Sequence, residues 1–213
     1  VIIIMPDTMS IERRQLVKAF GAELMLTEGA KGMAGSIEKA NELLDKNPNY
    51  ICLGQFDNED NPRAHYETTG PEILKEVKDV SFIVAGIGSG GTIVGAGKFL
   101  KEKNKEIKVI GIEPKSSPLI TENKSGPHKI QGIGANFIPK IYDKDIVDKV
   151  ITVSDEDSYE TVRLIANKLG ILIGISSGAN IFGAMKLSDE NPDKIIVTVA
   201  PDGVDKYMSM GIF

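Results

Sequence analysis

A glycine-rich stretch is the clearest candidate for chemistry in this sequence. Residues 84–99 read VAGIGSGGTIVGAGKF, and within them the segment GSGGT, Gly88 to Thr92, separates an apolar run from a stretch of small residues. Glycines allow a backbone to approach a ligand closely, and the N–H groups at a helix N-terminus point toward a bound anion. The pattern predicts a loop that holds a phosphate group at the start of a helix. Tight packing of a strand on a helix is the alternative explanation for these glycines.

The same glycines also fit a dinucleotide-binding fingerprint. Gly86, Gly88 and Gly91 match G-x-G-x-x-G, and Glu113 ends the next predicted strand, where a ribose-binding carboxylate would lie. An oxidoreductase that binds NAD is therefore a second interpretation of the loop, and other parts of the chain have to decide between the two.

The elements that would position the loop alternate along the chain. Short β-branched runs alternate with segments of helical period, which is typical of βαβ units around a parallel sheet. Helices are predicted to begin at Ser10 and Ser154 and to end at Gly21 and Gly170. The predicted strands are residues 1–5, 23–26, 50–54, 81–87, 109–113, 150–153 and 195–200. An α/β fold follows.

Composition and charge argue against several classes of function. The 213 residues carry a net charge of -5 without a block of five or more Lys or Arg, so nucleic acid is not an expected partner. No apolar stretch approaches the roughly 20 residues that a membrane span needs. The one cysteine, Cys52, lies in the apolar run YICLG and is predicted to be a buried hydrophobic residue in a cytoplasmic protein. His65 and His128 lack the spacing of metal ligands or of a triad, so both are expected to be structural and no metal site is predicted.

Five further stretches resemble the cysteine synthase family, the fold-type II enzymes that use pyridoxal 5'-phosphate (PLP). They occur in the family's order from Met5 onward: MPDTMSIERRQLVKAFGAELMLT, QFDNEDNPRAHYETTGPEI, GPHKIQGIGANFIP, GISSGAN and PDGVDKYMS. The resemblance implies three layers, with mostly parallel twisted sheets covered by helices on both faces. Residues 1–54 would then be the remainder of a smaller, incomplete N-terminal lobe, and residues 55–213 the larger PLP-binding lobe.

The resemblance also implies roles for particular residues. Ser176 would face the pyridine nitrogen of PLP, although its position also suits a helix N-cap. A neutral hydroxyl there makes the cofactor a weak electron sink, which suits β-elimination. By the same resemblance the cofactor's phosphate would be held by Gly88, Ser89, Gly90, Gly91 and Thr92, and the substrate side would be formed by Gln55, Phe56, Gly132 and Asn136.

The predicted reaction is β-elimination followed by β-replacement on a serine- or cysteine-type amino acid. The family's activity is the synthesis of cysteine from O-acetylserine and sulfide. Asn136 stands where the family usually has glycine, and it suggests an alternative: a cysteine-consuming, sulfide-releasing enzyme, either a desulfhydrase or one that forms lanthionine or serine. Asn also tolerates left-handed backbone geometry, so Asn136 could equally replace glycine for conformational reasons alone.

Two family features do not occur in these 213 residues. The serine-rich segment with the Schiff-base lysine and the threonine–serine–glycine–asparagine loop for the substrate carboxylate are both missing. We therefore expect this chain to be the C-terminal part of a longer enzyme and to be inactive as it stands; a non-catalytic relative is the alternative. The resemblance further implies a homodimer, sulfide or a thiol as second substrate, and binding of the C-terminus of a serine acetyltransferase.

Overall fold

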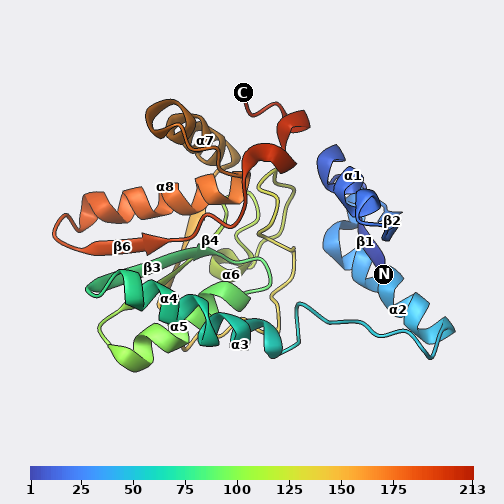
Figure 1. Cartoon of the computed structure of the whole chain (residues 1–213), viewed down its shortest axis with the longest axis horizontal. Helices are drawn as coiled ribbons and strands as arrows, with labels where there is room; N and C mark the ends of the chain where they lie inside the picture. Colours follow the sequence, from blue (N-terminus) through green and yellow to red (C-terminus); the bar gives the residue numbers. More distant parts are fainter.

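The computed structural model describes all 213 residues, and it contains two parallel sheets (Figure 1). The smaller sheet pairs β1 (Ile2–Pro6) with β2 (Glu23–Thr27). The larger sheet has the strand order β5-β4-β3-β6, and all of its neighbours are parallel. Its strands are β3 (Val80–Gly86), β4 (Lys108–Pro114), β5 (Lys149–Val153) and β6 (Ile195–Thr198). The predicted α/β fold is confirmed.

Eight α-helices surround the sheets. They are α1 (Ile11–Ala19), α2 (Gly32–Lys46), α3 (Asp60–Glu67), α4 (Thr69–Glu76), α5 (Gly91–Lys103), α6 (Leu119–Glu122), α7 (Asp155–Leu169) and α8 (Ile175–Glu190). Short 3-10 turns cover Gly29–Lys31, Val204–Lys206 and Met208–Met210. Several end signals are confirmed: Ser154 caps α7 by accepting a hydrogen bond from the backbone N–H of Asp157 at 3.1 Å, and Gly170 ends it in the left-handed conformation.

The larger sheet separates two hydrophobic cores. Along β3, Ile83 and Ala85 belong to one core and Val84 to the other, because successive side chains of a strand point to opposite faces. The first core includes residues of α5, and the second includes residues of α8. Helices therefore pack on both faces of this sheet, which gives the expected three layers.

The strand order places a topological switch point at β3. From β3 the chain continues to β4 and then β5 on one side, whereas β6 lies on the other side of β3. Open parallel sheets bind ligands at such a point, beyond the carboxyl ends of the strands. In this fold that location is the end of β3 next to the end of β6.

The prediction of a strand over residues 50–54 is wrong. These residues form irregular chain, and the side chains of Ile51 and Leu53 are 88% and 81% exposed. Cys52 is exposed as well, so its predicted burial is also wrong. A strand needs a neighbour to accept its backbone hydrogen bonds, and the sheets leave none for this run.

Two further features of the fold have no counterpart in the sequence-based expectations. Residues 54–73 have little periodicity, yet α3 and most of α4 form there. The apolar residues of α1 do not face a core: Phe20 is 86% exposed, and Ile11 and Leu16 are exposed as well. No helix in the structure combines the length and the apolar character needed to cross a bilayer.

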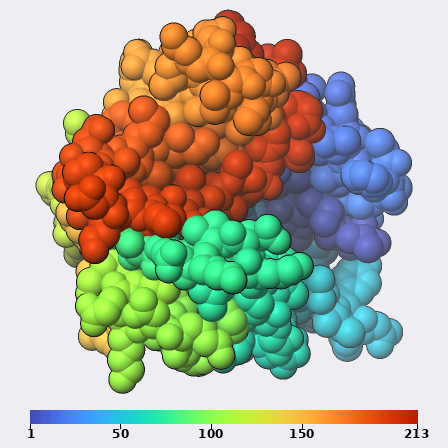
Figure 2. Space-filling model, turned by 60° about the vertical axis from the view of Figure 1, so that its left-hand side comes forward, coloured from blue at the N-terminus to red at the C-terminus, as the bar shows by residue number.

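The N-terminal unit, residues 1–46, is connected to α3 by irregular chain (Figure 1). It also contacts the C-terminal segment, which lies beside it in the space-filling view (Figure 2). Polar contacts join the unit to distant parts of the chain: Arg13 bonds to Asp202 and Tyr207, Glu12 bonds to Ser209, and Gln131 donates to the carbonyl of Thr8. The division of the chain at residue 54 stays a prediction.

Candidate functional site

A cavity of about 130 Å³ lies at the switch point of the larger sheet. It is lined by Gly86 at the end of β3 and by Val199 and Pro201 after β6. The N-terminal residues of α5 and the first turn of α8 also line it, and so do Gly132 and Ile133 from the loop before β5. Two helix N-termini therefore meet at one cavity, where their partial positive charges favour an anionic or electron-rich ligand.

The glycine loop lines this cavity at the N-terminus of α5. Gly90 is the N-cap of α5 and has a φ of 90°, a conformation that side chains rarely adopt. A Cβ on Gly88 would lie 2.3 Å from the carbonyl oxygen of Gly132, so the two loops can approach only because Gly88 has no side chain. Gly88 is therefore needed for the close packing of residues 88–92 on the loop that contains Gly132.

Asn61 supports the loop from behind, and sequence reasoning missed it. Its Nδ2 donates to Ser89 Oγ at 2.9 Å and to the carbonyl of Gln55 at 2.8 Å. Ser89 Oγ in turn accepts a hydrogen bond from the backbone N–H of Gly91 at 3.3 Å. The signal that could have revealed Asn61 is its place beside Pro62 in the first turn of α3, because proline there predicts a helix start.

His65 contacts the loop from the same side. Its Nε2 lies 3.1 Å from Thr92 Oγ1, and its Nδ1 lies 2.8 Å from Thr69 Oγ1. Burial lowers the pKa of His65 below its ordinary value of 6.5, because the imidazolium loses solvation there. His65 is therefore neutral at physiological pH and orders the hydroxyl of Thr92 at the start of α5.

The lowered pKa of His65 predicts a pH dependence of stability. Below about pH 6.5 the unfolded chain binds more protons at this residue than the folded chain, so the free energy of unfolding falls as the pH drops toward the folded pKa. We expect His65→Gln to reduce the loss of thermal stability between pH 7 and pH 5. Melting curves of both proteins at matched ionic strength measure this, and equal pH slopes would contradict the assignment.

Ser176 also lines the cavity, and it lies in the first turn of α8. Ser176 is only 4% exposed, and a Cβ on Gly132 would lie 3.4 Å from the Oγ of Ser176. The expected N-cap role of Ser176 is wrong, because Gly174 is the N-cap and Ser176 is the second helical residue. The structure places Gly88 to Thr92, Gly132 and Ser176 around one cavity.

The other predicted substrate-side residues lie outside this lining. Gln55 is exposed. Its backbone carbonyl accepts a hydrogen bond from Asn61, and Asn61 in turn bonds to Ser89 of the glycine loop. Phe56 packs edge-on against Phe137, with 4.9 Å between the ring centres. Asn136 has a φ of 62°, and its Oδ1 accepts a hydrogen bond from Ser117 Oγ at 2.8 Å. Left-handed geometry at Asn136 thus supports the conformational interpretation of this residue.

Glu113 argues against the dinucleotide interpretation. The residue is 2% exposed, and its carboxylate accepts hydrogen bonds from the backbone N–H groups of Ile120 at 2.8 Å and Thr121 at 3.0 Å. A carboxylate that stabilises the start of α6 in this way is not available to a ribose hydroxyl. The glycine loop therefore lacks the acidic partner that NAD binding requires.

The residues present fit a flat heteroaromatic ligand with one phosphate group. The cavity is lined by the glycine loop, Gly88 to Thr92, at the N-terminus of α5. Ser176 adds a neutral hydroxyl from the first turn of α8, and the cavity lining contains no charged side chain. Such a lining suits a phosphate held by backbone N–H groups and a ring nitrogen held by one hydrogen bond.

Comparison with known proteins agrees with this geometry. The family model "Pyridoxal-phosphate dependent enzyme" matches residues 1–202. The chain is 47% identical over 213 residues to cysteine synthase B of Campylobacter jejuni, with 100% of this chain and 71% of that protein covered.

Two solved structures have the same fold. The cysteine synthase of Entamoeba histolytica has a TM-score of 0.93 at 43% identity, covering 100% of this chain and 64% of that chain. A hydrogen sulfide-producing enzyme of Fusobacterium nucleatum has a TM-score of 0.94 at 44% identity, covering 97% of this chain and 71% of that chain. The chain thus spans 64% to 71% of the lengths of these three relatives.

Proposed function

Because this chain belongs to the family of pyridoxal-phosphate dependent enzymes, we propose that it provides the cofactor site of an enzyme that makes cysteine from O-acetylserine and sulfide. One observation carries the proposal: the glycine loop and Ser176 line the same uncharged cavity, which lies between two helix N-termini. The identities to cysteine synthases support the choice of reaction within the family.

The residues of the chain would hold the cofactor at both ends. Backbone N–H groups from Ser89 to Thr92 would bind the phosphate, and the dipole of α5 would stabilise its negative charge. The Ser176 hydroxyl would donate to the ring nitrogen without transferring a proton, and the positive end of α8 disfavours protonation of that nitrogen. When bound, PLP supplies the electron sink for breaking bonds at the α and β carbons of an amino acid.

The Schiff-base lysine is not assigned to any residue of this chain, because no lysine lines the cavity. We expect these 213 residues alone to bind PLP without a covalent bond and to show no turnover. The test is reduction with borohydride after PLP binding, followed by mass analysis of the chain. A PLP-modified lysine at the cavity and measurable cysteine formation would contradict this expectation.

The reaction is tested with the full-length protein loaded with PLP. O-Acetylserine with sulfide should give cysteine faster than cysteine alone releases sulfide. Release of sulfide as the faster reaction would support the second candidate function instead, a cysteine-consuming enzyme. The similarity to the Fusobacterium nucleatum enzyme favours this alternative.

Asn136 distinguishes the two candidate functions at the level of one side chain. Its Oδ1 is bonded to Ser117, which leaves its Nδ2 free to orient a nucleophile, although Asn136 itself lies outside the cavity lining. If Asn136 acts in this way, Asn136→Gly should change the ratio of cysteine synthesis to sulfide release by roughly tenfold, the effect of one hydrogen bond. The two rates are measured in parallel on both proteins, and an unchanged ratio would leave Asn136 with a conformational role only.

We further propose that the enzyme is a cytoplasmic homodimer with a PLP-binding lobe that begins near residue 55. Exposed apolar side chains at the end of α7 and just after it support an interface, since contiguous apolar surface often marks a protein contact. These residues are Leu169, Ile171 and Leu172. Light scattering on a size-exclusion column tests the dimer, and titration with the C-terminal peptide of a serine acetyltransferase tests that partner.

A further inference from the structure

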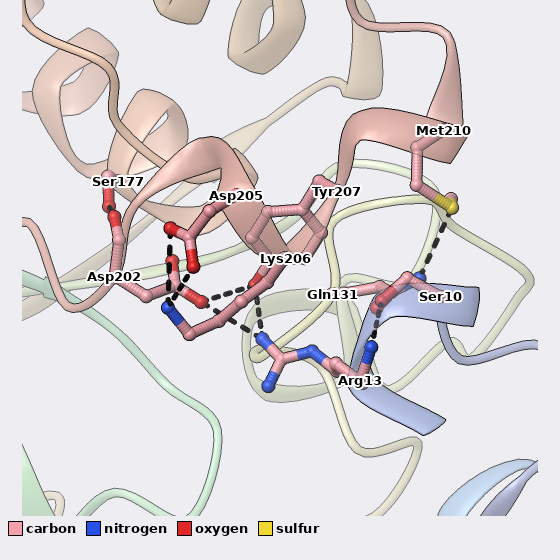
Figure 3. Close-up of polar contacts among 9 residues, drawn as sticks. All are labelled: Ser10, Arg13, Gln131, Ser177, Asp202, Asp205, Lys206, Tyr207 and Met210. Atoms are coloured by element: carbon pink, nitrogen blue, oxygen red, sulfur yellow. Dashed lines mark hydrogen bonds and ion pairs between the residues drawn. The ribbon is translucent and has the colours of Figure 1, made fainter. Parts of the chain in front are cut away.

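Asp202 lies where the segment after β6 meets the first turn of α8 (Figure 3). Its backbone carbonyl accepts hydrogen bonds from the N–H of Gly174 at 2.8 Å and from Ser177 Oγ at 3.2 Å. These two donors flank Ser176, which lines the cavity and is proposed to face the cofactor ring. The position of the Asp202 carbonyl therefore helps to set the position of Ser176.

The carboxylate of Asp202 is held by a different part of the molecule. Its Oδ2 accepts hydrogen bonds from Arg13 Nη2 at 2.9 Å and from the Tyr207 hydroxyl at 2.6 Å. The Arg13 guanidinium also lies over the Tyr207 ring, 5.1 Å from its centre, and it bonds to the Tyr207 hydroxyl. Arg13 belongs to α1 in the N-terminal unit, so one residue connects that unit to the start of α8.

Gly174, the N-cap of α8, is packed tightly by the same side chains. A Cβ on Gly174 would lie 2.0 Å from Asp202 Oδ1 and 2.8 Å from the ring of Tyr207. Tyr207 is fully buried, with 0% exposure. Both side chains therefore pack closely against the residue that begins α8, and the packing leaves no room for a side chain there.

The cluster is not fully hydrogen-bonded in this arrangement. Arg13 Nε and Asp202 Oδ1 are both buried without a partner. An arginine and a carboxylate can form two parallel hydrogen bonds, and here the Tyr207 hydroxyl shares Oδ2 with a single guanidinium nitrogen. Because unmet buried groups are unfavourable, a small shift of α1 would change the pairing at Asp202.

We propose that Asp202 is a positioning residue that couples the placement of α1 to the placement of Ser176. A shift of α1 moves Arg13, Arg13 moves the carboxylate of Asp202, and the carbonyl of the same residue then moves the first turn of α8. The inference rests on the proposed function for the identity of the ligand that Ser176 faces. It adds a way for the N-terminal unit to influence the ring end of the site.

The test compares two variants of α1 in the full-length protein. Arg13→Met removes the link to Asp202, whereas Glu12→Gln weakens the neighbouring contact of the same helix with Ser209, where Glu12 Oε1 accepts from the N–H at 2.7 Å. We expect Arg13→Met to speed amide hydrogen exchange in residues 174–178 by roughly tenfold, and to shift the absorption band of bound PLP. Glu12→Gln should leave both unchanged.

Equal exchange rates in the two variants, whether faster than in the wild type or the same, would overturn the proposal. Asp202→Asn replaces the carboxylate by an amide of almost the same size. It should also speed the exchange, and it serves as the test if Arg13→Met does not fold. The hydrogen exchange does not require PLP. Failure of the wild-type protein to bind PLP would therefore contradict the proposed function, while the comparison of exchange rates would still decide the role of Asp202.

Discussion

Replacing Gly88 by alanine is expected to weaken PLP binding by up to roughly 100-fold. The added Cβ would lie 2.3 Å from the carbonyl oxygen of Gly132, and neither atom belongs to a flexible side chain. The phosphate loop or the Gly132 loop must therefore move, and both are walls of the cavity. Overpacking of this kind costs about 1–3 kcal/mol, and each 1.4 kcal/mol corresponds to about tenfold in Kd.

Titration with PLP, followed by absorbance, measures the effect, and Gly170→Ala is the matched control. Gly170 also has a positive φ, 68°, but a Cβ there would have no neighbour within 4 Å. The control should lose about 1 kcal/mol of stability and keep the wild-type Kd. If Gly88→Ala bound PLP as tightly as the control, residues 88–92 would not be the phosphate cradle.

Replacing Ser176 by aspartate is expected to give the second large effect. A carboxylate at this position would lie in the first turn of α8, where the helix dipole stabilises it and allows the chain to fold. It would also favour a proton on the ring nitrogen of PLP and make the cofactor a stronger electron sink. We expect a shifted absorption band and a turnover reduced by roughly 100-fold, since the electrostatics of the site would no longer suit the reaction.

Ser176→Ala is the control for this substitution, because it removes the hydroxyl without adding a charge. The absorption band of PLP bound to Ser176→Ala should shift less than that of Ser176→Asp. The turnover of Ser176→Ala should lie between those of the wild type and Ser176→Asp. Absorption spectra over a range of pH and steady-state rates measure both variants. Identical spectra for the alanine and aspartate variants would mean that Ser176 does not contact the ring nitrogen.

Much of the fold could be predicted because its signals are local. The β-branched runs at 81–87 and 109–113 correspond closely to β3 and β4, and Ser154 with Asp157 marks the start of α7. The prediction of a strand at residues 50–54 was wrong, because an apolar pattern does not show whether a neighbouring strand is available for pairing. The helix α3 was missed although Asp60 and Pro62 in its first turn are typical start signals.

The site was predictable only in part, because its residues come from distant parts of the chain. The motif at 88–92 and Ser176 could each be recognised, but only the order β4-β3-β6 and the packing of α8 bring them to one cavity. The supporting contacts of Asn61 and His65 depend on the packing of α3 against α5. The capping role of Glu113 and the link from Asp202 to Arg13 are tertiary contacts that no spacing in the sequence indicates.

A crystal structure of the protein with bound PLP tests the central claim most directly. We predict that the phosphate accepts hydrogen bonds from backbone N–H groups between Ser89 and Thr92, and that the ring nitrogen faces Ser176 Oγ. A phosphate bound elsewhere, or a ring nitrogen out of reach of Ser176, would contradict the assignment of this cavity.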